Sequence, residues 1–339
     1  MLCIVFCHCT ENTFNMSAEW FQTAPHMLRI VRELFFTAGR LGVPVFLFLS
    51  GYLLLSRHRC RSFDDVLDFY RRKEWPLLRC WLLWIVIYFL IGGAYTQEAW
   101  HTLGRQLLLT DQPPYGHVWY MPMIIGIYLG IPLLSMLIEH GGRKLFFLLL
   151  ALSSFAAIRS SEQHLSRLIC GSESTPLRLL DVSFIGDGYV TYILLGYLAY
   201  LLADKLLSRR RSLLSLAAGC LVCGGIAFLY YQYHKQGVKI GLWYTDWRLI
   251  AGTFLLFLGF RCMDAWKSAL VTMLSQGAFA IYLMHYPVLR ALKKAGVLAS
   301  SQPWVNTLLL FASTFALSFV LYLGLRRIPF AARYLFLSR

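Results

Sequence analysis

Long apolar runs alternate with short charged connections along this chain. A long uncharged run lies within Tyr115–Leu137, where His117, Trp119 and Tyr120 precede about 20 apolar residues. A helix of that length crosses the hydrocarbon core of a bilayer, so the run predicts a membrane span. The other predicted spans are Leu41–Leu55, Leu77–Ala94, Leu145–Ile158, Ile185–Ala203, Leu213–Tyr231, Leu249–Cys262, Ala269–Leu289 and Val305–Leu325.

The N-terminal run MLCIVFCHC is apolar but too short to cross a bilayer. We expect it to be the second half of a helix whose first half is missing, through a misassigned start or a truncated chain. Repeated apolar runs of helical length favour helices over a barrel, whose strands would alternate in polarity. The sequence therefore predicts an all-α integral membrane protein, with about ten transmembrane helices in a single domain over residues 1–339.

Composition and charge support this class and predict an orientation. The chain is 58% hydrophobic and 14% charged, whereas a soluble domain carries about 25% charge. The net charge of +15 would suggest nucleic acid in a soluble protein, but here the basic residues lie mostly in short connections, so we expect no nucleic-acid partner. With Arg57–Arg79 in the cytoplasm, 19 of the 32 basic residues fall on that side. Both termini are then cytoplasmic.

Four ionisable residues fall in the outer half of the predicted spans: His8, His117, Asp187 and His285. Such groups are costly in a membrane and usually functional, so we predict that the four share one site. His8 is the strongest candidate because a desolvated, neutral imidazole suits a general base. A structural histidine bonded to a carbonyl at the interface is an equally good interpretation of it.

The other three groups also have structural alternatives. His117 suits the aromatic belt of a membrane interface. His285 precedes Tyr286 and Pro287, which predict a helix end, and a structural role is the favoured interpretation there. Asp187 begins a predicted helix and could be its N-cap; it could also orient a histidine or bind a substrate hydroxyl.

Basic residues gather at the predicted inner face, and they could bind phosphate groups because guanidinium donates bidentate hydrogen bonds. The alternative is an anchor on lipid headgroups. These residues are Arg71, Arg72, Lys73 and Arg79. Gly126 and Gly130 predict helix packing. Most of the nine cysteines lie in apolar runs, and neither these nor the Cys220–Cys223 pair predicts a metal site.

Six segments in order resemble the integral-membrane acyltransferase-3 family. They are IVFCHCTENTF; GRLGVPVFLFLSGYLL, with Arg40, Pro44, Ser50 and Gly51; FYRRK through RCWLLWIVIY; GHVWYMPMIIGIYLGIPLL; IGDGYVTYILLGYLAY; and SQGAFAIYLMHYPVL. The chain is most similar to the single-domain members, one of which O-acetylates enterobacterial common antigen. Two features depart from the family pattern: a family arginine would lie before Met1, and Cys80 stands where proline is common.

The resemblance implies an enzyme of the bacterial cytoplasmic membrane that moves an acyl group, usually acetyl, from cytosolic acyl-CoA to a sugar hydroxyl. The acceptor would be a surface glycan or a lipid-linked sugar, and no metal is implied. His8 matches the family histidine regarded as catalytic, and the basic cluster matches the donor region. His117 and Asp187 would orient the reaction or bind the acceptor. Further candidates for the acceptor site are Ser50, Trp119, Tyr120 and His285.

Two other functions stay open from the sequence. A transporter or flippase could use intramembrane His and Asp residues as a proton relay. However, the chain shows neither paired broken helices nor an internal repeat. An inactive, acyltransferase-like sensor or scaffold would account for the missing family arginine.

Overall fold

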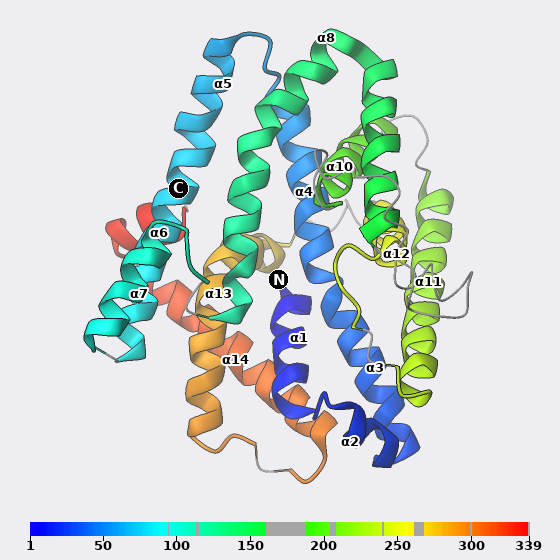
Figure 1. The fold of residues 1–339 in the computed structure, drawn as a ribbon, viewed down its shortest axis with the longest axis vertical. Helices are drawn as coiled ribbons and strands as arrows, with labels where there is room; N and C mark the ends of the chain where they lie inside the picture. The colour runs from blue at the N-terminus through cyan, green and yellow to red at the C-terminus, as the bar shows by residue number, and fades with distance from the viewer. Residues whose placement is uncertain are drawn as a thin grey trace. The chain divides into compact units, whose positions relative to one another are not determined.

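The computed structural model describes residues 1–93, 95–112, 115–160, 188–203, 208–238, 241–260, 268–298 and 300–337. These residues fold into helices without any strand (Figure 1), so the predicted all-α membrane fold is confirmed. Among them, five helical stretches are long and apolar enough to cross a membrane: His26–Arg57, Phe63–Gly92, Gly116–Ile158, Arg209–Lys235 and Pro303–Leu325. Tyr189–Leu202 and Trp247–Gly259 are shorter apolar helices.

The chain divides into two compact units. The first comprises Met1–Cys9, Ser62–Leu133 and Lys267–Arg339, and the second comprises Thr10–Arg61 and Leu134–Trp266. The single domain stays a prediction.

The elements, in chain order, are α1 (Leu2–Thr13), α2 (Ala18–Thr23), α3 (His26–Arg40), α4 (Gly42–Arg57), α5 (Phe63–Phe69), η1 (Tyr70–Glu74), α6 (Trp75–Gly92), α7 (Gln97–Leu107), η2 (Gly116–Trp119), α8 (Tyr120–Ser160), α10 (Tyr189–Ala203), α11 (Arg209–Lys235), α12 (Trp247–Gly259), α13 (Ala269–Lys294), α14 (Pro303–Leu325) and η5 (Ala331–Leu335).

In the first unit, the start of α1 packs against α13 and α14. The buried contacts join Val5 and Cys9 of α1 to Ile281 and Leu289 of α13 and to Leu310 of α14. This apolar core fixes the position of His8, which lies between Val5 and Cys9 in sequence.

A continuous helical stretch, α5–η1–α6, also belongs to the first unit. It begins at a capping box in which Ser62 and Asp65 satisfy each other's backbone groups. It contains a π-helical turn at Tyr70–Glu74 and ends at Gly93, whose φ of +67° favours glycine. The C-terminal turn η5 packs on α6, where Trp84 Nε1 donates to the Leu335 carbonyl at 3.0 Å.

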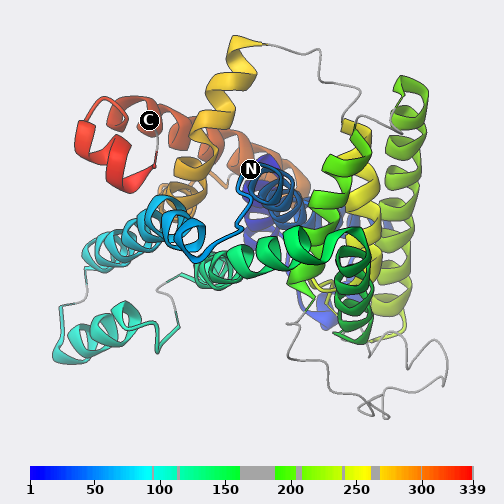
Figure 2. The same ribbon diagram turned by 90° about the horizontal axis from the view of Figure 1, so that it is seen from above.

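In the second unit, glycines allow pairs of helices to approach closely. A Cβ on Gly51 of α4 would lie 2.0 Å from the Ile193 carbonyl oxygen of α10, and one on Gly196 would lie 2.1 Å from that of Phe48. Figure 2 shows the adjacent α11 and α12 side by side. The packing predicted for Gly126 and Gly130 is not observed, because a Cβ on either would meet no described atom within 4 Å.

Helix α3 corrects the prediction that apolar helical structure begins at Leu41. The stretch from His26 to Arg57 is long and apolar enough to span, although α3 carries Arg32 and Glu33. Both side chains are buried, and Arg32 Nη2 lies 2.6 Å from Glu33 Oε1. Because the charges are paired, a segment that looks polar in sequence packs inside the protein.

Helix α8 contains the two spans predicted on either side of the sequence GGRK. Gly142 joins them with φ 63° and ψ −158°, a conformation that favours glycine, and Figure 1 shows the resulting turn at the top of α8.

Helix α13 corrects the predicted helix end at Pro287, because it continues to Lys294. Proline has no N–H, so the carbonyl four residues earlier loses its helical donor. That carbonyl belongs to Leu283, and the Tyr88 hydroxyl donates to it at 2.7 Å. A side chain from α6 thus replaces the missing backbone bond and allows the helix to pass through the proline.

Candidate functional site

Three histidine rings meet inside the first unit. They come from α1 (His8), η2 (His117) and α13 (His285). The ring centroids of His117 and His285 lie 4.9 Å apart, those of His8 and His285 5.4 Å, and those of His8 and His117 6.0 Å. The structure thus brings together three of the four residues that were predicted to share a site, and the shared site itself stays a prediction.

His285 has a defined tautomer. Its Nδ1 lies 2.6 Å from the Tyr282 carbonyl oxygen and 3.2 Å from the Ile281 carbonyl oxygen, both on its own helix. Carbonyl oxygens only accept, so Nδ1 must carry the proton and, in the neutral ring, Nε2 keeps a lone pair. The residue is fully buried, and Nε2 has no hydrogen-bond partner among the described residues. Nδ1 therefore accounts for the predicted structural role of His285, and Nε2 is the nitrogen that stays available for a chemical role.

His117 is held mainly by ring contacts. Its side chain is buried, and neither ring nitrogen has a hydrogen-bond partner in the described part of the chain. Tyr286 stacks on it with centroids 4.7 Å apart and planes 14° apart, and Tyr282 donates to its backbone carbonyl at 3.1 Å. Buried polar atoms are usually bonded, so two such nitrogens at one ring indicate a place where a ligand can bind.

His8 is the most accessible of the three. It is partly exposed, whereas His117 and His285 are buried. Its ring stacks on His285 with an interplanar angle of 28°, and its edge meets Tyr286 at 5.7 Å. An accessible imidazole above a buried one is well placed to exchange a proton with a substrate.

A polar pocket adjoins this cluster and shares two tyrosines with it. Tyr88 and Tyr115 both lie 6.0 Å from His117 between ring centroids. The same tyrosines line a pocket of about 460 Å³ together with Arg290, whose guanidinium lies 5.6 Å from the Tyr115 ring centroid. The remaining lining residues are Phe89, Gly92, Thr96, Glu98, Ala99, Thr102 and Gln106.

Two predicted acceptor-site residues lie next to the cluster. Tyr120 meets Tyr282 edge-on at 5.7 Å. Trp119 lines a second pocket, of about 420 Å³, with Gln106 and Asp111. There Arg105 donates to Asp111 at 2.9 Å and so holds the pKa of that carboxyl below its ordinary value.

Ser50 and Asp187 stay predictions. Ser50 is on α4 in the second unit, and Asp187 lies outside the described residues. No set of three side chains that could hold a metal ion is found in the described ranges.

The basic cluster lies far from the histidines along one helical stretch. About 15 residues separate Lys73 from Tyr88, which is about 22 Å of helix. Arg72 pairs with Asp68 at 2.7 Å, whereas Arg71 is exposed. Arg79 lies six residues after Lys73 on the helical stretch, and its guanidinium lies 4.3 Å from the Tyr334 ring centroid. The four cations therefore do not form one compact group.

Sequence reasoning missed Glu74, which lies among these cations. It is buried in the π-helical turn, and neither carboxylate oxygen has a partner among the described residues. A π-turn often marks a functional site, but the sequence YRRKE carries no signal for one.

Sequence reasoning also missed the ring contacts of Tyr286 and the ion pair between Glu11 and Arg40. Tyr286 was predicted only as a helix end, although it contacts both His8 and His117. Glu11 follows His8 by one helical turn and pairs with Arg40 at 3.2 Å. The helical spacing of His8 and Glu11 is the signal that could have predicted a shared face.

A family model described as an acyltransferase domain, Acyl_transf_3, matches residues 1–323. The chain belongs to the acyltransferase-3 family. No curated protein and no solved structure matched the chain. The matched residues include all three histidines, the π-turn and Arg290.

Acyl transfer in such a domain needs a group that takes a proton from the nucleophile. The histidine cluster is the set of described side chains best suited to that task, since it combines an accessible imidazole with a second imidazole of fixed tautomer. The family match does not identify the acyl group, the donor or the acceptor.

Proposed function

We propose that this acyltransferase moves an acyl group, most simply acetyl, from cytosolic acyl-CoA to a hydroxyl of a surface glycan or a lipid-linked sugar. The observation that carries the proposal is the partly exposed His8 ring stacked on the buried His285 ring and beside His117. The proposed location is the bacterial cytoplasmic membrane, with both termini in the cytoplasm.

The proposed chemistry uses His8 as the general base. Its imidazole accepts the proton of the acceptor hydroxyl while the hydroxyl oxygen bonds to the thioester carbonyl carbon. The carbon–sulfur bond then breaks, and the imidazolium returns the proton to the departing CoA sulfur. The products are an ester and free CoA thiol, so atoms and charge balance without a metal or an oxidant.

The neighbouring rings support His8 in this scheme. His285 cannot turn freely because its Nδ1 is bonded to its own helix. The His117 ring is packed against Tyr286 and points its edge at His285. We propose that both position His8 and the acceptor hydroxyl, and that Asp187 assists at the acceptor side.

The donor would enter at the basic end of α5–η1–α6. Arg71, Arg72, Lys73 and Arg79 supply guanidinium and ammonium donors for the phosphates of CoA. The flexible pantetheine arm would then run along α6, over the roughly 22 Å of helix between Lys73 and Tyr88, whose ring lies beside His117.

The acceptor would occupy the 460 Å³ pocket beside the cluster. Tyr115 offers an aromatic face, and Glu98, Gln106 and Arg290 offer donors and acceptors suited to a polyhydroxylated ring. Tyr88 and Tyr115 border both the pocket and His117, and the His117 ring lies 6.0 Å from that of His8, so a hydroxyl bound there would lie near the proposed base. Ser50, Trp119, Tyr120 and His285 stay proposed acceptor-site residues.

The deciding experiment compares wild type with His8→Ala in liposomes supplied with radiolabelled acetyl-CoA. We expect the loss of a general base to slow release of label from CoA by about 10²- to 10⁴-fold. His140→Ala is the matched control, because His140 is exposed on α8. It should retain full activity, and all three proteins should elute as the same folded species.

Undiminished transfer by folded His8→Ala would exclude the proposed role of His8. Substrate uptake without consumption of acetyl-CoA would favour a transporter instead. Label that leaves CoA only when an oligosaccharide is added would show that the hydroxyl acceptor completes the reaction.

A further inference from the structure

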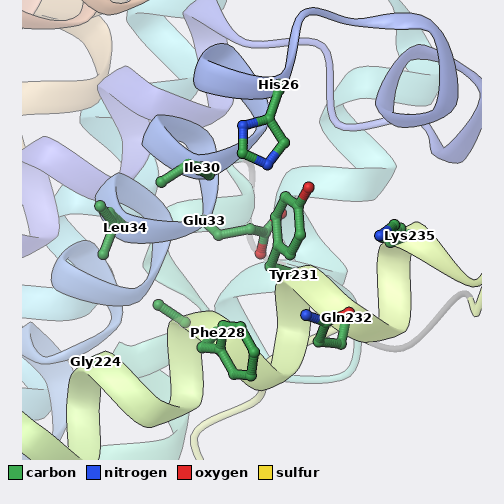
Figure 3. A pocket seen from close by; sticks show the side chains of 10 residues that line it. His26, Ile30, Glu33, Leu34, Gly224, Phe228, Tyr231, Gln232 and Lys235 are labelled. Atoms are coloured by element: carbon green, nitrogen blue, oxygen red, sulfur yellow. The ribbon is translucent and has the colours of Figure 1, made fainter.

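A pocket in the second unit is lined by none of the residues assigned to acyl transfer. It lies between α3 and α11 and has a volume of about 380 Å³ (Figure 3). From α3 it is lined by His26, Ile30, Glu33 and Leu34, and from α11 by Gly224, Ala227, Phe228, Tyr231, Gln232 and Lys235.

The lining changes from apolar to polar along the helix axes. Leu34, Phe228 and Gly224 line one end, and His26, Gln232 and Lys235 line the other (Figure 3). Gly224 and Lys235 are 11 residues apart on α11, which is about 16 Å of rise. That depth matches one leaflet of a bilayer, since the whole hydrocarbon core is about 30 Å thick.

The apolar end is open on its outer side. Leu34 is 48% exposed and Phe228 is 64% exposed, although both lie on stretches long and apolar enough to span a membrane. Two helices that expose such side chains beside a recess offer a channel for an acyl chain.

The polar end carries a net positive charge. Glu33 lines the pocket, but its carboxylate Oε1 lies 2.6 Å from Arg32 Nη2 and 3.1 Å from His234 Nδ1. The negative charge is therefore compensated, and the Lys235 ammonium adds a cation at the end of the pocket that His26 also lines. The imidazole of His26 meets the Tyr231 ring edge-on at 5.8 Å, so aromatic packing supports the headgroup end.

The end of α11 is also fixed in place. Gln22 of α2 donates through Nε2 to the carbonyl of His234 at 2.6 Å. This hydrogen bond from α2 therefore helps to hold Lys235, the last residue of α11, in position.

From the leaflet-deep recess, the exposed apolar lining and the cationic rim, we propose that the α3–α11 pocket is a binding site for one anionic phospholipid of the membrane. Its phosphate binds at Lys235, His26 and Gln232, and one acyl chain lies along Leu34 and Phe228 towards Gly224. The site is independent of the transfer reaction, because it uses none of the residues assigned to donor, acceptor or base.

The experiment uses the whole purified protein in nanodiscs that contain a photoactivatable phospholipid. The probes have identical diazirine-bearing chains and carry either phosphatidylglycerol or phosphatidylcholine headgroups. Crosslinked peptides are identified by mass spectrometry. We expect phosphatidylglycerol to label the lining of α3 and α11 about fivefold more than phosphatidylcholine.

Two variants with matched controls test the two ends of the pocket. Gly224→Leu fills the apolar end, and Gly225→Leu adds the same side chain outside the lining; a Cβ at either position meets no described atom within 4 Å. Lys235→Gln removes the rim cation, whereas Lys294→Gln removes an exposed lysine at the end of α13. We expect Gly224→Leu and Lys235→Gln to lower phosphatidylglycerol labelling about fivefold and the controls to leave it unchanged.

Equal labelling by both headgroups, or labelling that survives both pocket variants, would overturn the proposal. If Gly224→Leu does not fold, the proposal is still tested by the comparison of the two headgroups on wild type and by the labelling of Lys235→Gln. Loss of acyl transfer in any of these variants is not expected, which separates this site from the proposed function.

Discussion

At the scale of single residues, the two nitrogens of His285 have different surroundings, and only Nε2 is proposed to take part in the chemistry. Nδ1 bonds to carbonyls of its own helix, and Nε2 is buried with no partner in the described part of the chain. An asparagine can keep a donor near Nδ1 but has no atom at Nε2. His285→Asn therefore separates the structural task from the chemical one.

We expect His285→Asn to fold normally and to lower kcat by about 10²-fold, the usual contribution of a group that handles a proton. Thermal unfolding in detergent and the acetyl-CoA assay measure the two effects. If the activity falls only in proportion to lost folded protein, Nε2 has no part in the reaction. The double variant with His8→Ala should be no slower than His8→Ala alone, because residues that act as a unit are not additive.

The residues also differ in how far the sequence could predict them. His8, His117 and His285 were predicted to meet, because an ionisable group in an apolar run is rarely without a function. Tyr286 and Tyr88 could not be predicted as parts of the site. A tyrosine at a membrane interface has no distinctive pattern, and only the fold of α6 and α13 shows what it contacts.

At the scale of elements, α4 and α10 pack backbone to backbone through glycine. A Cβ on Gly51 would lie 2.0 Å from the Ile193 carbonyl oxygen, so the helices must separate to admit it. We expect Gly51→Ala to lower the free energy of unfolding by about 2 kcal/mol, the usual cost of overpacking. Chemical denaturation in detergent measures this difference.

Gly126→Ala is the control for the Gly51 prediction. It lies in α8, where a Cβ meets no described atom within 4 Å, and alanine favours a helix over glycine. It should therefore leave stability unchanged or raise it slightly. Equal destabilisation of the two variants would contradict the packing argument.

The pocket beside the histidines is built by α6, α7 and α13. Arg290 lines this pocket from the side of α13 that meets Tyr115. We expect Arg290→Gln to raise the KM for the acceptor about tenfold at unchanged kcat, because a hydrogen bond to a charged group is worth about 1.5 kcal/mol. Lys294→Gln, four residues further along the helix, should leave KM unchanged. A change in kcat alone would instead place Arg290 in the chemical step.

At the scale of the whole molecule, orientation decides from which side the donor arrives. The predicted orientation places Arg57–Arg79 and both termini in the cytoplasm. We therefore expect inverted membrane vesicles to use external acetyl-CoA and right-side-out vesicles to use it only after permeabilisation. Measuring label transfer in both preparations checks this. Equal activity in intact vesicles of both kinds would refute the predicted sidedness.

The sequence alone determined the class of this protein. Long uncharged runs cannot be buried in a water-soluble core of this size, so they had to form membrane helices, and six segments in family order led to the acyltransferase-3 family. Only the tertiary structure decided which buried polar groups find an ion-pair or hydrogen-bond partner. Arg32 and Glu33 look like a break in α3 until the fold brings His234 to them, and Pro287 looks like a helix end until the fold brings Tyr88 to the Leu283 carbonyl. In each case the partner lies more than a hundred residues away in sequence, and hydrogen bonding between distant residues leaves no local pattern.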